Sequence, residues 1–257
     1  MFHSATICGK NTWSDYHMVP ADGLIMLPSP SQKLTSIDVK TGNGVVDMSE
    51  VLTGFPVFQN REDEIKFYVL EDWEYADYSG TTPVSMTAYE LKSKLMNEIH
   101  GKTGRIVLED DPNWYFEGRF FVKDFNPENF RREVTIGYSV KPYMYSNTAT
   151  NVTVEGMGSE IWSMTTLDET TLGYMPVTPV INFSGLASAT TVKIRVFKPS
   201  YTDPSDIWAN PILVAEKEYG ANGDKQWADV NAYEKARFCL LAPVGVTTVW
   251  KFTKGRL

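Results

Sequence analysis

The residue types that perform catalysis or bind metals are present in this 257-residue sequence, but not at the spacings that such chemistry requires. His3, His17 and His100 have no spacing that suits a shared metal ion, and neither an HExxH nor a CxxC motif occurs. GxSxG elbows, Walker-type phosphate loops and GxGxxG motifs are missing as well. We therefore predict no catalytic residue, no metal site and no cofactor. His100 lies at the end of a predicted helix, and we expect it to have a capping or packing role.

Three consecutive acids, Glu109, Asp110 and Asp111, could bind a hard cation such as calcium, which takes several oxygen ligands. They lack the alternating acids and the glycine of a calcium loop. Asp111 also precedes Pro112, and this pair is typical of a turn. The sequence favours the simpler interpretation, in which a strand ends here and an Asp-Pro turn follows.

Four tryptophans in the second half could serve another chemistry, because the face of an indole ring can stack on a sugar. Tryptophan in a β-sandwich lies more often in the core, and we expect this of each one. Trp208 is the least core-like, since it lies in the polar segment 201–210, and it is the candidate for contact with a carbohydrate or a docked protein. The four residues are Trp162, Trp208, Trp227 and Trp250.

The charge of the chain argues against a grip on nucleic acid. Residues 1–142 contain 14 Lys and Arg against 21 Asp and Glu, a difference of −7, whereas residues 143–257 contain 10 against 11, a difference of −1. DNA binding through phosphates requires clustered cations, and the sequence has no run of Lys and Arg. We expect instead an acidic surface past which DNA can slide without being bound.

Hydropathy argues against a membrane protein. No window reaches the roughly 18 apolar residues of a membrane span. The N-terminus lacks the basic start and apolar core of a secretory signal. Folding in a cytoplasm is therefore expected, with Cys8 and Cys239 as free thiols.

Strands should dominate the first half. The Asn-Gly turn at 43–44 predicts a hairpin between strands at 34–39 and 45–46. Alternation of apolar and polar residues predicts a half-buried strand at 133–140, and Gly118 is expected to mark a bulge or kink. Further strands are expected at 23–27, 56–60, 65–70, 105–108 and 114–125, with the charged residues 61–64 as a connection.

One helix should interrupt these strands at about residues 88–100. Thr87 and Glu90 have the spacing of a capping box, in which each side chain accepts a hydrogen bond from the other residue's amide. Leu91, Leu95 and Ile99 then form one apolar stripe that is expected to pack on a sheet.

Short strands separated by turns predict a β-sandwich in the second half. We expect strands at 152–155, 180–183, 192–197, 212–216, 237–241 and 246–252, and one helical turn at 229–236. The polar stretch 146–150 divides the chain into predicted domains of residues 1–146 and 147–257. The predicted fold class is mainly β.

Residues 37–50, IDVKTGNGVVDMSE, resemble the I-D-V-x-G-x-x-G-x-x-D-x-[ST]-E stretch of distal tail proteins from phages of Gram-positive bacteria. Further matches follow in order over residues 10–142, about half of the chain. Lys40-Thr41 departs from the Pro-Gly common in that turn, which leaves the turn type open. The second half matches only as a β-rich sequence of suitable length. The matching residues include Asp38, Gly42, Gly44, Asp47, Asn60, Arg61, His100, Gly101, Asp111, Gly118 and Arg119.

The resemblance implies a structural protein of the tail tip, with two β-sandwich-like domains. The N-terminal domain, with one helix, would assemble six copies into a ring that continues the tail tube and lets DNA pass. The C-terminal domain would be galectin-like and peripheral. Implied partners are the major tail protein, the tail-associated hub protein and receptor-binding or baseplate proteins, in a virion assembled in the host cytoplasm.

Two other functions compete with this one. The second half could act as a carbohydrate-binding module that contacts host cell-wall sugars through its tryptophans. A wall-degrading hydrolase is the weakest hypothesis, because the sequence offers no triad, metal site or resolvable pair of acids.

Overall fold

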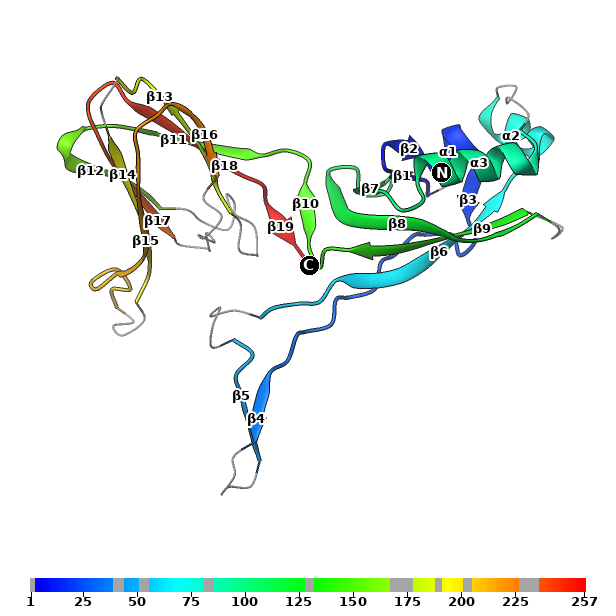
Figure 1. The fold of residues 1–257 in the computed structure, drawn as a ribbon, viewed down its shortest axis with the longest axis horizontal. Helices are drawn as coiled ribbons and strands as arrows, with labels where there is room; N and C mark the ends of the chain where they lie inside the picture. Colours follow the sequence, from blue (N-terminus) through cyan, green and yellow to red (C-terminus); the bar gives the residue numbers. More distant parts are fainter. Residues whose placement is uncertain are drawn as a thin grey trace. The chain divides into compact units, whose positions relative to one another are not determined.

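The computed structural model describes residues 3–38, 44–50, 56–80, 86–127, 132–166, 178–187, 191–200, 205–226 and 236–257. The chain divides into two compact units, Met1–Met144 and Tyr145–Leu257. Antiparallel strands dominate both units, so the fold is mainly β, as predicted (Figure 1). Cys8 and Cys239 are free thiols.

The strands of the first unit form one antiparallel sheet with the order β2-β1-β7-β8-β9-β6-β3. The predicted strands at 105–108, 114–125 and 133–140 are confirmed as β7, β8 and β9. The strands are β1 (Ala5–Ile7), β2 (Lys10–Asn11), β3 (Met18–Pro20), β6 (Arg61–Val69), β7 (Thr103–Leu108), β8 (Trp114–Asn126) and β9 (Arg132–Val140).

Three strand predictions for this unit are wrong in part. Residues 23–27 form no strand, and 56–60 contain only an isolated bridge between Phe58 and Gln32. The charged residues 61–64, predicted as a connection, begin strand β6. They fit there because Arg61 is buried and hydrogen-bonded, while Glu62 and Asp63 are exposed to solvent.

Helix α3 (Ala88–Glu98) confirms the predicted helix and its capping box. The Thr87 hydroxyl accepts from the Glu90 amide at 3.3 Å, and the Glu90 carboxylate accepts from the Thr87 amide at 2.8 Å. Leu91, Leu95 and Ile99 are fully buried in a core shared with β1, β6, β8 and β9. This apolar stripe holds the helix on the sheet.

Two further helices of this unit were not predicted, so the expectation of a single helix is corrected. Helix α1 (Thr12–Tyr16) starts at Asn11, whose side chain accepts from the amides of Trp13 and Ser14. Helix α2 spans Asp72–Ser79. Both are too short to show an apolar periodicity. In the part of the chain that the structure describes, no helix has the length and hydropathy needed to cross a membrane.

A two-stranded arm leaves the sheet between β3 and β6 (Figure 1). Strands β4 (Ser36–Asp38) and β5 (Val45–Asp47) pair with each other, which confirms the predicted hairpin; its turn at 39–43 lies outside the described residues. Backbone bonds extend the arm toward the sheet, from the Lys33 amide to the Val57 carbonyl at 2.7 Å and from the Gln59 amide to the Ser31 carbonyl at 2.8 Å.

The second unit contains two four-stranded antiparallel sheets, β11-β18-β13-β16 and β12-β17-β14-β15. Their inner faces share one core, in which Trp250 and Phe252 of the first sheet contact Phe238 of the second. This packing defines the predicted β-sandwich. The strands of these sheets are β11 (Thr150–Glu155), β12 (Gly158–Thr166), β13 (Val180–Ser184), β14 (Val192–Lys198), β15 (Ile212–Tyr219), β16 (Gly223–Gln226), β17 (Arg237–Ala242) and β18 (Thr247–Phe252). Two short strands outside them, β10 (Met144–Ser146) and β19 (Gly255–Arg256), pair with each other.

All six strands predicted for this half are confirmed, whereas β12, β16 and the short β10 and β19 were missed. Strand β12 escapes detection because its pattern is inverted. The polar Ser163 and Thr165 lie opposite the core residues Leu240 and Phe238, while Trp162 and Met164 lie on the outer face. Residues 229–235 of the predicted helical turn lie outside the described residues.

Candidate functional site

The first group of motif residues clasps the end of helix α3 to strand β8. His100 Nδ1 accepts from the Val122 amide at 3.1 Å. The Gly101 amide donates to the Phe120 carbonyl at 2.8 Å, and Arg119 donates to the Gly101 carbonyl at 2.7 Å. Gly101 has a φ of +73°, a backbone conformation that glycine adopts without strain. His100, Gly101 and Arg119 therefore act as one structural clasp.

We expect His100→Ala to loosen this clasp without unfolding the unit. The Val122 amide would lose its acceptor at a site open to water, so the loss of stability should be small, about 1 kcal/mol. Hydrogen exchange should show faster exchange at the Val122 amide and little change at Val134 in the centre of the sheet. Unchanged exchange at Val122 would contradict the clasp. His100→Gln, which keeps an acceptor, is the control.

A second motif residue, Arg61, joins two distant segments from a buried position. Its side chain lies over the Phe116 ring, with 5.1 Å from Cζ to the ring centroid. Nε donates to the Pro142 carbonyl at 2.8 Å, and Nη1 donates to the Pro28 carbonyl at 2.7 Å. Burial lowers the pKa of this guanidinium from its ordinary value. Arg61 thus fixes the start of the arm and the last residues of the first unit.

Gly118 of β8 pairs with Val140 of β9, the same residue that Arg61 of β6 pairs with from the other side. A Cβ atom at this position would lie 2.2 Å from the Ser139 carbonyl oxygen and 2.4 Å from the Val140 Cα. The predicted bulge at Gly118 is wrong, because Gly118 pairs regularly with Val140 and the register shifts later, between Val122 and Asp124. The glycine is required for close backbone approach. Asn60 contacts the same strand through the Ser139 hydroxyl at 3.4 Å.

The arm carries the remaining motif residues and has two unlike faces. Ile37 pairs with Val46 on one face, and both are exposed, by 56% and 48%. Asp38 and Asp47 lie on the opposite face together with the exposed Val45, because side chains alternate along a strand. Hydrogen bonds from the Ser49 hydroxyl and amide lower the pKa of Asp47. Gly44 has a φ of +120°, and Gly42 lies outside the described residues.

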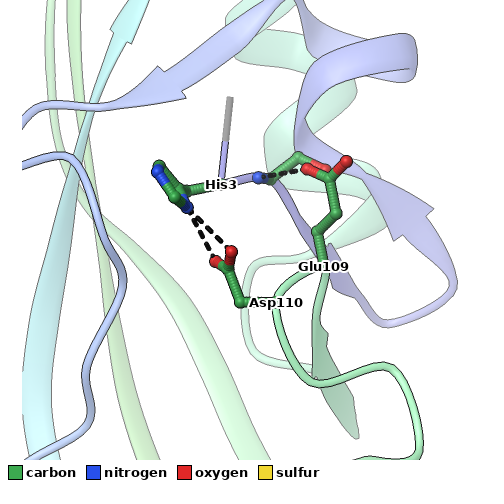
Figure 2. A network of polar contacts seen from close by, with 4 residues as sticks. His3, Glu109 and Asp110 are labelled. Atoms are coloured by element: carbon green, nitrogen blue, oxygen red, sulfur yellow. Dashed lines mark hydrogen bonds and ion pairs between the residues drawn. The ribbon is translucent and has the colours of Figure 1, made fainter. Parts of the chain in front are cut away.

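The acidic cluster at 109–111 ties down the N-terminal segment (Figure 2). Both carboxylate oxygens of Asp110 lie 2.9 Å from His3 Nδ1, and Glu109 accepts from the Ser4 amide at 2.9 Å. The Trp114 amide donates to the Asp111 carbonyl at 3.2 Å, as expected of the predicted Asp-Pro turn. The described residues contain no group of three or more His, Cys, Asp or Glu that could hold a metal ion.

The tryptophans of the second unit divide between core and surface. Trp250 is 1% exposed, which confirms the core prediction, and its indole N–H donates to the Thr248 hydroxyl. For Trp162 that prediction is wrong, because it is half-buried on the outer face of the β12-β17-β14-β15 sheet beneath Arg195. Trp208 is also half-buried, with Arg237 over its ring. Trp227 lies outside the described residues.

Sequence reasoning missed the apolar face of the arm and the stacked arginines. The first had a local signal, since Ser36-Ile37-Asp38 and Val46-Asp47 alternate and place apolar residues on one face. The stacked arginines had no local signal in the sequence. Arg195 follows Trp162 by 33 residues and Arg237 follows Trp208 by 29, and only the sandwich brings them together.

These two units, a sheet with a helix and an extended arm followed by a two-sheet sandwich, define a fold found in a phage structural protein. Along its whole length the chain is similar to the SPP1 Dit (gp 19.1) protein, described as a paradigm of the hub adsorption apparatus in phages infecting Gram-positive bacteria. The match covers 100% of both chains with a TM-score of 0.57 and 16% sequence identity, and it shows the fold. No known sequence family and no curated protein sequence matches the chain.

Proposed function

We propose that this chain is a distal tail protein, a structural hub in the tail tip of a long-tailed phage, and that it has no catalytic activity. The observation that carries the proposal is the full-length match of fold to a hub adsorption protein. The ordered motif series supports it, because its residues form the clasp at His100 and the buried contacts of Arg61. In this proposal the protein belongs to the virion and is assembled in the host cytoplasm.

The arm supports assembly into a ring. A two-stranded hairpin alone is marginally stable in water, and within the described residues β4 and β5 pair with no other strand. Leu34, Ile37 and Val46 expose apolar side chains along it. A neighbouring copy would cover these groups, and six copies joined by this one repeated contact would close a ring.

Electron microscopy of the purified chain, alone and with the tail-associated hub protein of the same phage, tests this proposal. Rings of six-fold symmetry are the expected result. A chain that stays monomeric and binds neither the hub protein nor the major tail protein would overturn the proposal.

We expect Ile37→Glu to abolish the ring while leaving the monomer folded. The substitution would place a carboxylate in an apolar contact, which costs several kcal/mol per subunit without a partner charge. Sedimentation velocity should then show a monomer at concentrations at which the wild type forms hexamers. Ser36→Glu is the matched control, because it adds the same charge to the opposite face of the arm. Equal assembly of both variants would exclude this face from the contact.

The other face of the arm fits the passage of DNA. Asp38 and Asp47 are exposed there, and the first half of the chain has an excess of seven acids over bases. Acids that line a channel repel phosphates and avoid trapping the DNA. In the proposed ring this face points into the lumen. A ring structure whose lumen is lined mainly by Lys and Arg would contradict this step.

The second unit is proposed to lie at the periphery and to dock receptor-binding or baseplate proteins. The alternative is a carbohydrate-binding module, which the surface positions of Trp162 and Trp208 favour. Calorimetry of the full chain with host wall polysaccharides distinguishes docking from carbohydrate binding, since only a carbohydrate-binding module should give heat of binding.

A further inference from the structure

The outer face of the β12-β17-β14-β15 sheet carries two arginines, each stacked on a tryptophan. Arg195 of β14 lies over Trp162, with 4.5 Å from Cζ to the ring, and Arg237 of β17 lies over Trp208 at 3.8 Å. We call these four residues the arginine–tryptophan face. Stacking on an indole fixes the plane of a guanidinium and orients its N–H groups.

The two pairs are neighbours on the sheet. Arg195 pairs in register with Cys239, which is two residues from Arg237 on the same face of β17. Burial raises the pKa of the Cys239 thiol, and the charges of Arg237 and Arg195 oppose that rise, so both guanidinium groups act on the same atom. The two stacked pairs therefore lie close together on one face of the sheet.

The charges of the two arginines are not equally compensated. Arg195 forms an ion pair with Glu216. Arg237 donates from Nε to the Thr166 hydroxyl at 3.3 Å, and in the part of the chain that the structure describes no carboxylate forms an ion pair with it. The terminal N–H groups of Arg237 are thus free to bind a carboxylate in the two-pronged geometry that arginine favours.

Two exposed apolar side chains lie near Arg237 on the same face of the sheet. Met164, 65% exposed, belongs to β12 and lies opposite Cys239, two residues along β17 from Arg237. Leu213, 48% exposed, lies opposite Phe197, and Phe197 in turn pairs with Arg237. Leu213 belongs to β15, which is the edge strand of the sheet among the described strands, and an edge strand can pair with an extended segment. Arginine and tryptophan surrounded by apolar groups are the residues that dominate protein–protein contacts.

The stacking also disfavours a sugar at this surface, because a guanidinium already covers one face of each indole ring. We propose that the arginine–tryptophan face docks an extended, acidic and apolar segment of another tail protein, with Arg237 binding its carboxylate. This inference rests on the proposed function, in which the second unit is a docking platform.

The test uses the full-length chain and overlapping 15-residue peptides that cover the other tail proteins of the same phage. Bound peptides should contain Asp or Glu beside apolar residues. Arg237→Glu should weaken their binding by about tenfold or more. Lys251→Glu is the matched control, because it makes the same change of charge at an exposed position on the other sheet and should leave binding unchanged. A peptide whose acid is replaced by Lys should recover binding to the Arg237→Glu variant.

Two results would overturn the inference. The first is binding of the peptides that is equal in the wild type and in Arg237→Glu. The second is binding of host wall polysaccharide that Arg237→Glu abolishes, with no peptide bound. In either case, six-fold rings in electron micrographs would still support the proposed hub function. A wild-type chain that forms no rings and binds no tail protein would refute the hub function itself.

Discussion

Replacing Gly118 with alanine should destabilise the first unit by about 3 kcal/mol, because the new methyl group has no space. The Cβ atom would lie 2.2 Å from the Ser139 carbonyl oxygen and 2.4 Å from the Val140 Cα, and both obstacles are backbone atoms. Strand β8 is held between β7 and β9, with Gly104 and Val140 as the partners of Gly118. Neither neighbour can move away without breaking its own ladder.

Urea denaturation followed by hydrogen exchange checks this result. The variant should lose protection at the amides of β8 and β9 at a lower urea concentration than the wild type, while strands β14 and β17 keep theirs. Glu117→Ala is the control, since it introduces alanine one position away and removes only an exposed ion pair with Lys141. If the midpoints of the two variants agree, the close approach at Gly118 has no energetic weight.

Local signals predicted the elements whose own residues determine them. Helix α3 was predicted because Thr87 and Glu90 cap it and Leu91, Leu95 and Ile99 form its stripe, all within thirteen residues. Strand β14 was predicted because Val192, Ile194 and Val196 alternate toward the core. Such elements carry their pattern in sequence regardless of what they contact.

Elements whose pattern depends on distant residues were missed or misplaced. Residues 23–27 have the composition of a strand, yet Leu24 and Met26 are exposed and no strand pairs with them. Strand β6 begins with four charged residues. Arg61, the first of them, can be buried there because its side chain donates to the carbonyls of Pro28 and Pro142. Neither the absence of a strand at 23–27 nor the start of β6 at Arg61 can be predicted from the local sequence.

The motif residues illustrate the same limit at the candidate site. Their order along the chain resembled that of distal tail proteins, but their roles depended on contacts between segments far apart. His100 contacts Val122 across 22 residues, and Arg61 contacts Pro142 across 81. Residue types and spacing indicated which positions matter, and only the fold shows that they are structural.

Arg61→Met should lower the stability of the first unit by about 3 kcal/mol and release the base of the arm. Methionine keeps much of the apolar contact with the Phe116 ring but removes every N–H group. The carbonyls of Pro28 and Pro142 would lose donors at 2.7 and 2.8 Å, and hydrogen bonds to a charged donor contribute about 1.5–3 kcal/mol each.

Arg105→Met is the matched control for this variant. Arg105 also lies over an aromatic ring, that of Tyr115 at 4.0 Å, but its side chain is exposed and should contribute less than about 1 kcal/mol. Denaturation midpoints measure the difference in stability, and hydrogen exchange at residues 31–36 reports on the arm. Equal losses in the two variants would show that burial of Arg61 adds nothing.

Assembly gives this variant a second, independent readout. If the proposed ring forms and Arg61 positions the arm, Arg61→Met should raise the protein concentration needed for the ring by more than its loss of monomer stability explains, because a loosened arm must be ordered again on binding. Ile37→Glu should abolish hexamers at unchanged monomer stability. If Arg61→Met is destabilised yet assembles at the wild-type concentration, Arg61 contributes only to folding. The position of the arm would then not depend on Arg61.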